Sequence, residues 1–222
     1  MGPEHHSPNW LAHLLGISRG ILESLAKSHG SHYHPFQRPK RDGGQRDIDN
    51  PDNAIKAVQR RIVDRLLKPL PFPECVQGCL PGRSAKTNAE HHLKQTSLVT
   101  IDIASFFPSV SNRHVYSAWD ALGLGPEIAR LLTHLTTYHG HLPQGAPTSP
   151  YLANLVVLKA DAGIQKAASK LGVHYTRHVD DVALSGENAR EVMGEAIRQI
   201  QALGFAVKRR MNRTGNLGGR VV

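Results

Sequence analysis

The chain has 222 residues, and its 27 Lys and Arg outnumber its 18 Asp and Glu, which gives a formal net charge of +9. A chain of this length can bury a substantial core as one domain or as two small ones. The excess of positive charge favours an anionic partner, nucleic acid first, although many basic surfaces are only solvated. No apolar run approaches the ~18 residues of a membrane helix, and no apolar signal segment opens the chain. We therefore expect a cytoplasmic protein with no membrane partner.

The N-terminal region predicts two short helices followed by a basic hairpin. Apolar residues recur at roughly helical spacing over residues 10–28, and Ser18 is expected to cap the second helix. Asp42-Gly43-Gly44 then lies between two short extended runs, a pattern that indicates a hairpin. Its arms carry Lys40 and Arg46 on either side of the tip. Facing cations repel unless an anion such as a triphosphate lies between them, so the hairpin is either an anion site or a solvated basic element.

A basic amphipathic helix is predicted to start at Pro51, with Asn50 as its cap, and to end near Leu67. A second, short helix is expected over residues 84–93. Between the two helices, Cys75 and Cys79 lack a second pair at a metal-binding spacing, so we expect two reduced thiols rather than a zinc site.

The central stretch, residues 98–103, is mostly apolar or β-branched and predicts a buried strand, yet it contains Asp102. A lone desolvated carboxylate is costly, so such residues are usually paired or bind a metal. Asp180 and Asp181 are candidate partners, because the extended runs on both sides of them predict a hairpin with the pair at its turn. Three such carboxylates would need a divalent cation, and hard oxygen ligands suit Mg²⁺. A solvated Asp-Asp turn is the alternative.

The remaining segments predict helices around a few strands. Helices are expected over residues 111–122, 125–137, 150–170 and 187–203, and a last strand over residues 204–207 is followed by a basic tail. Two prolines and a glycine fix the path of the loop at residues 142–150.

In this order, the motifs resemble those of bacterial reverse transcriptases, most closely the retron type. Residues 102–110 resemble the first palm motif, residues 142–150 match the second almost letter for letter, and residues 175–181 resemble the third. The stretch from Asn88 to His92 fits the Asn-Ala-x-x-His element that distinguishes retron enzymes from other bacterial reverse transcriptases.

This resemblance implies an α+β right-hand polymerase fold. N-terminal helices and fingers would occupy residues 1–95, and a palm with an antiparallel sheet packed on helices would occupy residues 96–222. The residues that follow the palm motifs leave no room for a thumb, so we expect the thumb to be absent.

The resemblance also implies RNA-directed DNA synthesis, which makes the chain a nucleotidyltransferase. Asp102 and Asp180, with Asp181 close by, would hold two Mg²⁺ ions, with Mn²⁺ as an alternative metal. The backbone carbonyl of Ile103 would complete one metal shell. The ions would activate the primer hydroxyl and stabilise the charge on the leaving pyrophosphate.

Further residues take on roles in nucleotide binding by the same resemblance. Lys40 and Arg46 occupy the fingers positions that grip the triphosphate. Phe107 falls where the family places an aromatic gate beneath the sugar, which excludes a ribose 2′-hydroxyl. Gln144 and Gly145 would lie over the incoming nucleotide and its template base, where glycine permits close backbone approach.

Two other groups of residues would contact nucleic acid. His178 and Val179 are expected at the primer and template, although the family usually has Tyr or Phe at the first position and often Ala at the second. Asn88, Ala89 and His92 form the retron-type RNA element.

A later palm motif normally places Lys seven residues after its Gly-Phe pair, as a proposed general acid. Counting from Gly204 reaches Met211 instead, with Lys208 and several arginines nearby. No residue is therefore assigned that role.

The expected partners are a structured noncoding RNA that serves as template and primer, deoxynucleoside triphosphates and an RNA–DNA duplex. The resemblance also allows a separate effector protein and a role in antiphage defence. One alternative is an RNA-binding scaffold with a reverse-transcriptase-like fold and little or no synthesis. The other is a relative of group II intron reverse transcriptases, which the Asn88-to-His92 element disfavours.

Overall fold

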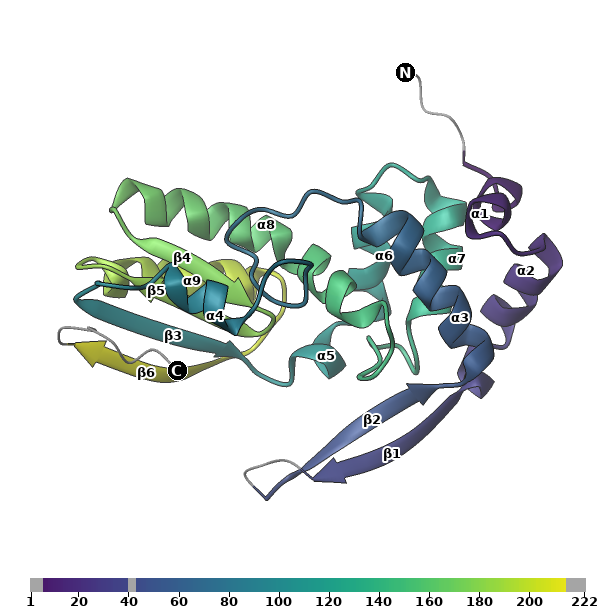
Figure 1. The fold of residues 1–222 in the computed structure, drawn as a ribbon, viewed down its shortest axis with the longest axis horizontal. Coiled ribbons are helices and arrows are strands. Elements are labelled where there is room, and N and C mark those ends of the chain that lie inside the picture. The colour runs from purple at the N-terminus through teal and green to yellow at the C-terminus, as the bar shows by residue number, and fades with distance from the viewer. Residues whose placement is uncertain (1–5, 40–42, 215–222) are drawn as a thin grey trace. The chain divides into compact units, whose positions relative to one another are not determined.

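The computed structural model describes residues 6–39 and 43–214 and shows an α+β fold (Figure 1). The chain divides into two compact units: Met1–Leu70 with Phe107–Val156, and Pro71–Phe106 with Val157–Val222. Because both units take segments from both halves of the sequence, they do not follow a single boundary near residue 95. The assignment of fingers to residues 1–95 and palm to 96–222 remains a prediction. No helix in the described part of the chain is long and apolar enough to cross a bilayer.

Short helices form most of the first unit. They are α1 (Pro8–Leu15), α2 (Arg19–Lys27), α3 (Asn53–Ile62), α6 (Asn112–Asp120) and α7 (Pro126–Thr136), with a 3₁₀ turn η1 (His29–His32) after α2. The predicted pair of N-terminal helices is confirmed, and the Ser18 side chain accepts a hydrogen bond from the Ile21 backbone N–H at 3.3 Å.

The predicted hairpin is confirmed as β1 (Tyr33–Pro39) and β2 (Gln45–Pro51), which pair antiparallel. Arg38 lies directly opposite Arg46 in this register, while Gln37 donates to the Asp47 carboxylate at 3.0 Å. Lys40 lies outside the described residues.

The expected start of the basic helix was wrong by two residues. β2 continues through Pro51, and α3 begins at Asn53 behind an Asp52 cap. The Asp52 carboxylate accepts from the N–H groups of Ala54 and Ile55 at 2.9 and 3.0 Å, and its charge also favours the positive end of the helix dipole. A π-helical turn, η2 (Val63–Leu67), extends α3 to the predicted end.

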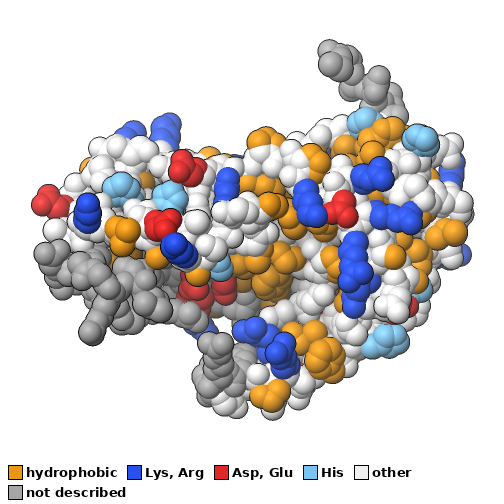
Figure 2. All heavy atoms as spheres, in the orientation of Figure 1, with side chains coloured by type: hydrophobic (Ala, Val, Ile, Leu, Met, Phe, Trp, Pro, Cys, Tyr) orange, Lys and Arg blue, Asp and Glu red, His pale blue; other side chains and the backbone are white. Residues whose placement is uncertain are grey.

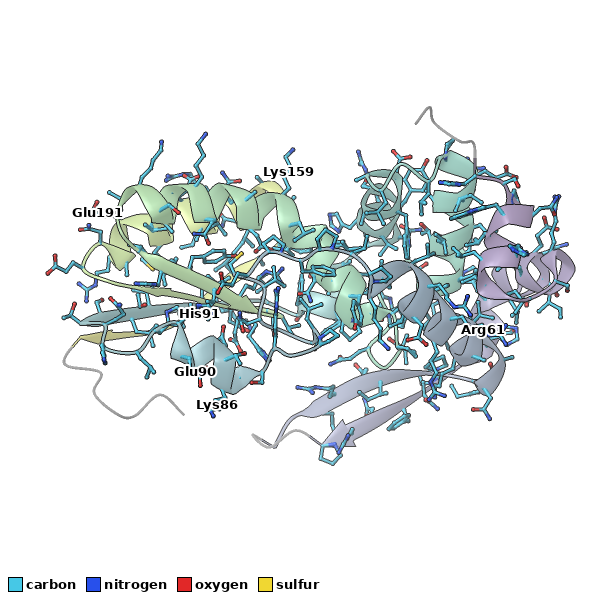
Figure 3. All side chains as sticks on the ribbon, turned by 45° about the horizontal axis from the view of Figure 1, so that its top comes forward. Arg61, Lys86, Glu90, His91, Lys159 and Glu191 are labelled. Atoms are coloured by element: carbon cyan, nitrogen blue, oxygen red, sulfur yellow. The ribbon has the colours of Figure 1, made fainter. Side chains whose placement is uncertain are left out.

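Lys and Arg side chains gather over the region of α3 (Figure 2). Some of these positively charged side chains form hydrogen bonds or ion pairs within the chain. Arg61 (Figure 3) donates to the carbonyls of Leu15 and Gly16 at 2.9 and 2.6 Å. Lys68 pairs with Asp64 at 2.5 Å.

The second unit is built on an antiparallel sheet in the order β4-β5-β3-β6 (Figure 1). Its strands are β3 (Ser97–Ile103), β4 (His174–His178), β5 (Asp181–Ser185) and β6 (Val207–Thr214). The central strand and the acidic hairpin are confirmed. The last strand was predicted over residues 204–207 but starts where that prediction ended. Its basic sequence carries no apolar signal, and pairing with β3 supplies its backbone hydrogen bonds instead.

The sheet has one apolar and one polar face, because side chains alternate along each strand. On the apolar face lie the buried side chains Val99, Ile101, Ile103, Val182 and Leu184. α8 (Ser149–Lys170) and the amphipathic α9 (Ala189–Ala202) cover this face. On the other face lie Thr100, Asp102, Thr176, Asp181 and Ser185. The short helix α4 (Ala85–Glu90) leads into the residues that pack on the polar face. A four-residue turn, α5 (Phe106–Ser109), follows β3.

Candidate active site

Two of the three predicted metal ligands face each other across neighbouring strands. Asp102 of β3 is the direct partner of Asp181 of β5, and the Ile103 N–H donates to the Asp180 carbonyl at 3.0 Å. Since Ile103 and Asp180 exchange the hydrogen bond, Asp102 and Asp181 form the adjacent non-hydrogen-bonded pair, where Cβ atoms lie closest. Like charges directly opposite destabilise a sheet, so this pair favours the binding of a cation.

The three carboxylates differ in exposure. Asp102 is buried with 7% of its surface exposed, Asp180 is half-buried and Asp181 is exposed. Across the described residues, no three Asp, Glu, His or Cys side chains are grouped as one metal site. The structure therefore places Asp102 opposite Asp181 with Asp180 in the adjoining turn, and the binding of one cation by all three carboxylates stays a prediction. Carboxylate oxygens at the end of a sheet remain a donor set that fits Mg²⁺.

A strained two-residue turn presents Asp180. Val179 and Asp180 link β4 to β5, and Val179 has a φ of 62°. Two-residue hairpin loops require such positive φ values and normally place Gly or Asn there. A β-branched residue in this region costs roughly 1–2 kcal/mol, so surrounding contacts must hold the turn in place.

Gly78 makes one of these contacts. A Cβ atom at Gly78 would lie 2.4 Å from the backbone N of Val179 and 2.7 Å from its Cγ2. The preceding residues pair with the outer edge of β4, because the Gln77 N–H donates to the Arg177 carbonyl and the Arg177 N–H donates to the Cys75 carbonyl, both at 2.7 Å. These residues thus form an added edge to the sheet that supports the turn.

Arg177 holds the same turn from the apolar face. Its fully buried guanidinium donates twice to the Asp161 carboxylate of α8, at 2.8 and 2.7 Å, and once to the Val179 carbonyl at 2.8 Å. The hydroxyl of buried Tyr175 also donates to Asp161. The buried carboxylate raises the pKa of Arg177 further, against the opposing effect of burial, so the guanidinium stays charged. Breaking a buried ion pair of this kind typically costs about 3–5 kcal/mol.

Lys208 is a site residue that sequence counting did not identify. It is the direct partner of Asp102 on β6, and cross-strand partners share a face. The register shifts between Thr100 and Ile101, which pair with Met211 and Arg209. The count of seven residues from Gly204 passes over Lys208, because it follows the family pattern and not the pairing of β6 with β3.

His92 is buried against the polar face of the sheet and is bonded to two of its strands. It is 2% exposed, and its two ring nitrogens lie 2.7 Å from the hydroxyls of Ser185 and Thr176 on the polar face. Burial, followed by the positive charge of neighbouring histidines, lowers the pKa of His92 to about 4, so the ring is neutral at pH 7. The neighbouring His91 lies at the end of α4, beyond the Lys86–Glu90 pair (Figure 3).

The RNA-contacting roles of the remaining residues stay predictions. Asn88 and Ala89 are half-buried on α4. His178 is half-buried and lies on the same face of the sheet as Asp102 and Asp181, because it pairs with Asp181. That position is compatible with its predicted contact to the primer.

The residues predicted to bind the nucleotide lie in the first unit. The loop at Gln144 is joined to β2, because the Asp49 N–H donates to the Gln144 carbonyl at 2.9 Å and the Gln144 N–H donates to the Asp49 carboxylate at 3.1 Å. Gly145 has a φ of 137°, and a Cβ there would lie 3.1 Å from Ile48. The close approach that requires this glycine is therefore to β2 of the chain itself.

A cavity of about 530 Å³ lies beside this loop. Its lining includes Phe36, Asp49, Tyr138, His139, His141 and Gln144. Phe36 is half-exposed. Aromatic and amide groups of this kind can stack on a base and form hydrogen bonds with it.

Arg46 and Phe107 also belong to the first unit. Arg46 is exposed, and the opposed Arg38 repeats the arrangement of facing cations that was predicted for Lys40 and Arg46. Phe107 is partly exposed, whereas Phe106 is buried and packs edge-on against Phe205 with ring centres 5.5 Å apart. The role of Phe107 as a sugar gate stays a prediction.

The sequence matches the reverse transcriptase (RNA-dependent DNA polymerase) family over residues 38–214. The chain is 35% identical to the retron Mx65 reverse transcriptase of Myxococcus xanthus, in an alignment that covers 94% of this chain and 55% of that protein. It is 34% identical to the retron Mx162 reverse transcriptase of the same species (85% and 43% covered) and 35% identical to the retron Ec86 reverse transcriptase of Escherichia coli (67% and 46% covered).

The chain thus spans about half the length of the curated relatives it matches. The matched segment contains the strand with Asp102, the loop with Gln144 and the turn with Asp180 and Asp181. These comparisons confirm the resemblance that the motifs predicted, and the chain belongs to the reverse transcriptase family.

Proposed function

We propose that the chain carries the catalytic centre of an RNA-directed DNA polymerase. The observation that carries this proposal is the pairing of Asp102 with Asp181 at the end of the sheet, with Asp180 in the adjoining turn. Two carboxylates that lie directly opposite each other repel, and a bound cation offsets that repulsion. Membership of the reverse transcriptase family supports the same reading.

In this proposal, Asp102 and Asp180 hold the metals, and Asp181 adds negative charge on the same face as Asp102. Two Mg²⁺ ions, when bound, would activate the primer 3′-hydroxyl and stabilise the charge on the leaving pyrophosphate. The Ile103 carbonyl is one residue from Asp102 and is available as a further oxygen ligand. Arg177 and Gly78 fix the turn, so Asp180 is presented in one position without reorganisation.

Nucleotide selection falls to the first unit. Arg46 would bind the triphosphate, and Gln144 would contact the incoming base pair. Phe107 would exclude a ribose 2′-hydroxyl by bulk. The anchoring of the Gln144 loop to Asp49 supports this division of roles, because binding residues act best when their own positions are fixed.

We further propose that the template is a structured RNA of the retron type, with deoxynucleoside triphosphates as substrates. The relatives that support this are named retron reverse transcriptases. A separate effector protein and a role in antiphage defence extend the same proposal.

The direct test compares Asp180→Asn with Asp120→Asn, which makes the same chemical change at an exposed position on α6. Primer extension on a defined RNA template, with Mg²⁺ and deoxynucleotides, should be lost in Asp180→Asn and retained in Asp120→Asn. Thermal unfolding and RNA binding should be unchanged in both variants, because the substitution removes charge but little volume. Wild-type extension by Asp180→Asn would refute the catalytic assignment.

The wild-type chain separates the proposal from the scaffold alternative. If it binds RNA tightly yet incorporates no nucleotide with Mg²⁺ or Mn²⁺, the non-synthesising scaffold is the better description. A clear preference for intron-derived over retron-type template RNA would instead favour the group II intron alternative.

A further inference from the structure

We propose that a cavity in the first unit, between η1, α6 and α7, is a binding site for a phosphate group. This cavity, here the arginine–histidine cavity, has a volume of about 360 Å³. Its lining includes His29, Asn112, Arg113, Tyr116, Arg130 and His134. None of these residues belongs to the candidate active site.

Cationic and titratable side chains reach this cavity from three separate elements. Arg113 comes from the start of α6, Arg130 and His134 from successive turns of α7, and His29 from η1. The rings of His29 and His134 meet edge to face with centres 5.1 Å apart. His29 Nδ1 donates to the Ala26 carbonyl at 2.8 Å, which leaves Nε2 to bond to a ligand.

The cavity has no internal counter-charge. No Asp or Glu lines it, and neither Arg113 nor Arg130 forms an ion pair with any residue that the structure describes. Two other exposed arginines do have acidic partners: Arg19 pairs with Glu23 and Arg198 with Glu195, both at 2.6 Å. Unpaired cations gathered in a hollow repel one another, and a bound anion removes that repulsion.

The environment of His134 supports this reading. Burial lowers the pKa of His134, and the positive charges of His29 and Arg130 lower it further. An anion between these groups would offset both charge effects. Two guanidinium groups, together with the neutral donors of Asn112 and Tyr116, can form several hydrogen bonds with the oxygens of one phosphate group.

Two sources could supply the phosphate: the backbone of a polynucleotide, or a free nucleotide or pyrophosphate. The backbone source rests on the proposed function, because it requires the chain to hold RNA. The site itself does not depend on catalysis, so it can be tested by binding alone.

The experiment uses the full chain and the double variant Arg113→Gln/Arg130→Gln. The control is Lys166→Gln/Lys170→Gln, which removes the same charge from exposed positions on α8. The first probe is a 20-nucleotide single-stranded RNA carrying a 3′ fluorophore, measured by anisotropy from 50 to 300 mM salt. The second probe is pyrophosphate, measured by calorimetry.

The cavity variant should bind one or both probes at least tenfold more weakly, while the control stays within about twofold of wild type. If RNA is the ligand, the slope of log affinity against log salt should fall by about 0.7, since the loss of one phosphate contact removes ~0.7 for a single strand. Loss of RNA binding identifies the polynucleotide backbone as the source. Loss of pyrophosphate binding alone identifies the free nucleotide or pyrophosphate.

Unchanged binding of both probes in the cavity variant would overturn the proposal, and so would a wild-type chain that binds neither probe. Both arginines are exposed, so the variant should unfold at the wild-type temperature. Arg113→Lys/Arg130→Lys, which keeps the charge but loses the planar fork, should retain part of the binding. Probe binding and primer extension are measured separately, so failure at the cavity and failure at the catalytic site are distinguishable.

Discussion

Gly78→Ala should disable the catalytic turn without touching a predicted metal ligand. The glycine lies against Val179, where an added Cβ would be 2.4 Å from the backbone N and 2.7 Å from Cγ2. A third overlap, at 3.0 Å, involves the carbonyl carbon of His178. Two of the three atoms belong to the backbone, so a side-chain rotation cannot relieve the clash.

The size of the effect follows from these distances. Ordinary contacts of a Cβ atom begin at about 3.4 Å, so the turn or the edge segment must move by about 1 Å. Overpacking of this kind typically costs about 1–3 kcal/mol of stability. A displacement of about 1 Å at a reacting group can lower the rate about 100-fold. We therefore expect a moderate loss of stability and a much larger loss of nucleotide incorporation.

The assay is single-nucleotide primer extension with Mg²⁺, measured beside thermal unfolding. Gly20→Ala is the matched control, because a Cβ at Gly20 meets nothing within 4 Å. The control should incorporate at the wild-type rate, and Gly78→Ala should keep the wild-type affinity for RNA. If Gly78→Ala incorporates nucleotides within twofold of wild type, the edge segment does not position the turn and this reasoning fails.

Two further predictions concern sugar selection and pH. Phe107→Val should admit ribonucleotides, because the proposed gate acts by bulk; equal use of ribo- and deoxynucleotides by the wild type would assign Phe107 to packing alone. For His92, the folded-state pKa of about 4 lies below the ordinary value of 6.5, so the unfolded chain binds more protons between these values. Unfolding free energy from urea titrations should therefore fall by up to roughly 3 kcal/mol as the pH drops from 6.5 to 4. His92→Gln should lack this component, and an identical pH dependence in both proteins would exclude His92 as its source.

Local signals were sufficient to predict most elements of the fold. The β1–β2 hairpin follows from Gly43 and its neighbours, and the acidic hairpin follows from two extended runs that flank Asp180 and Asp181. The apolar and β-branched residues around Asp102 predicted a buried strand, which is β3. Each of these signals lies within a few residues of the feature that it predicts.

The missed features depend on contacts between distant segments. The Asp52 cap was missed because Asn50 and Pro51 offer an equally plausible local start, and only pairing with β1 keeps Pro51 in the strand. The opposition of Lys208 and Asp102 depends on the pairing of β6 with β3, two strands that are far apart in the sequence. Asp161 lies 16 residues before Arg177, on a helix whose composition predicts burial but not an ion-pair partner.

Burial of the apolar face of the sheet, together with contacts at the turn, explains how the carboxylates and the strained turn are held in place. A slip of one residue in the β3–β5 register would move Asp102 to the apolar face and carry Ile101 out of it, so burial of the aliphatic side chains fixes the register. That register sets Asp102 against Asp181 regardless of their repulsion. The positive φ of Val179 is then held by Gly78 on one side and by the Arg177–Asp161 pair on the other. Hydrophobic burial on one face thus stabilises an arrangement of charge on the other that would not form alone, and a bound cation would stabilise it further.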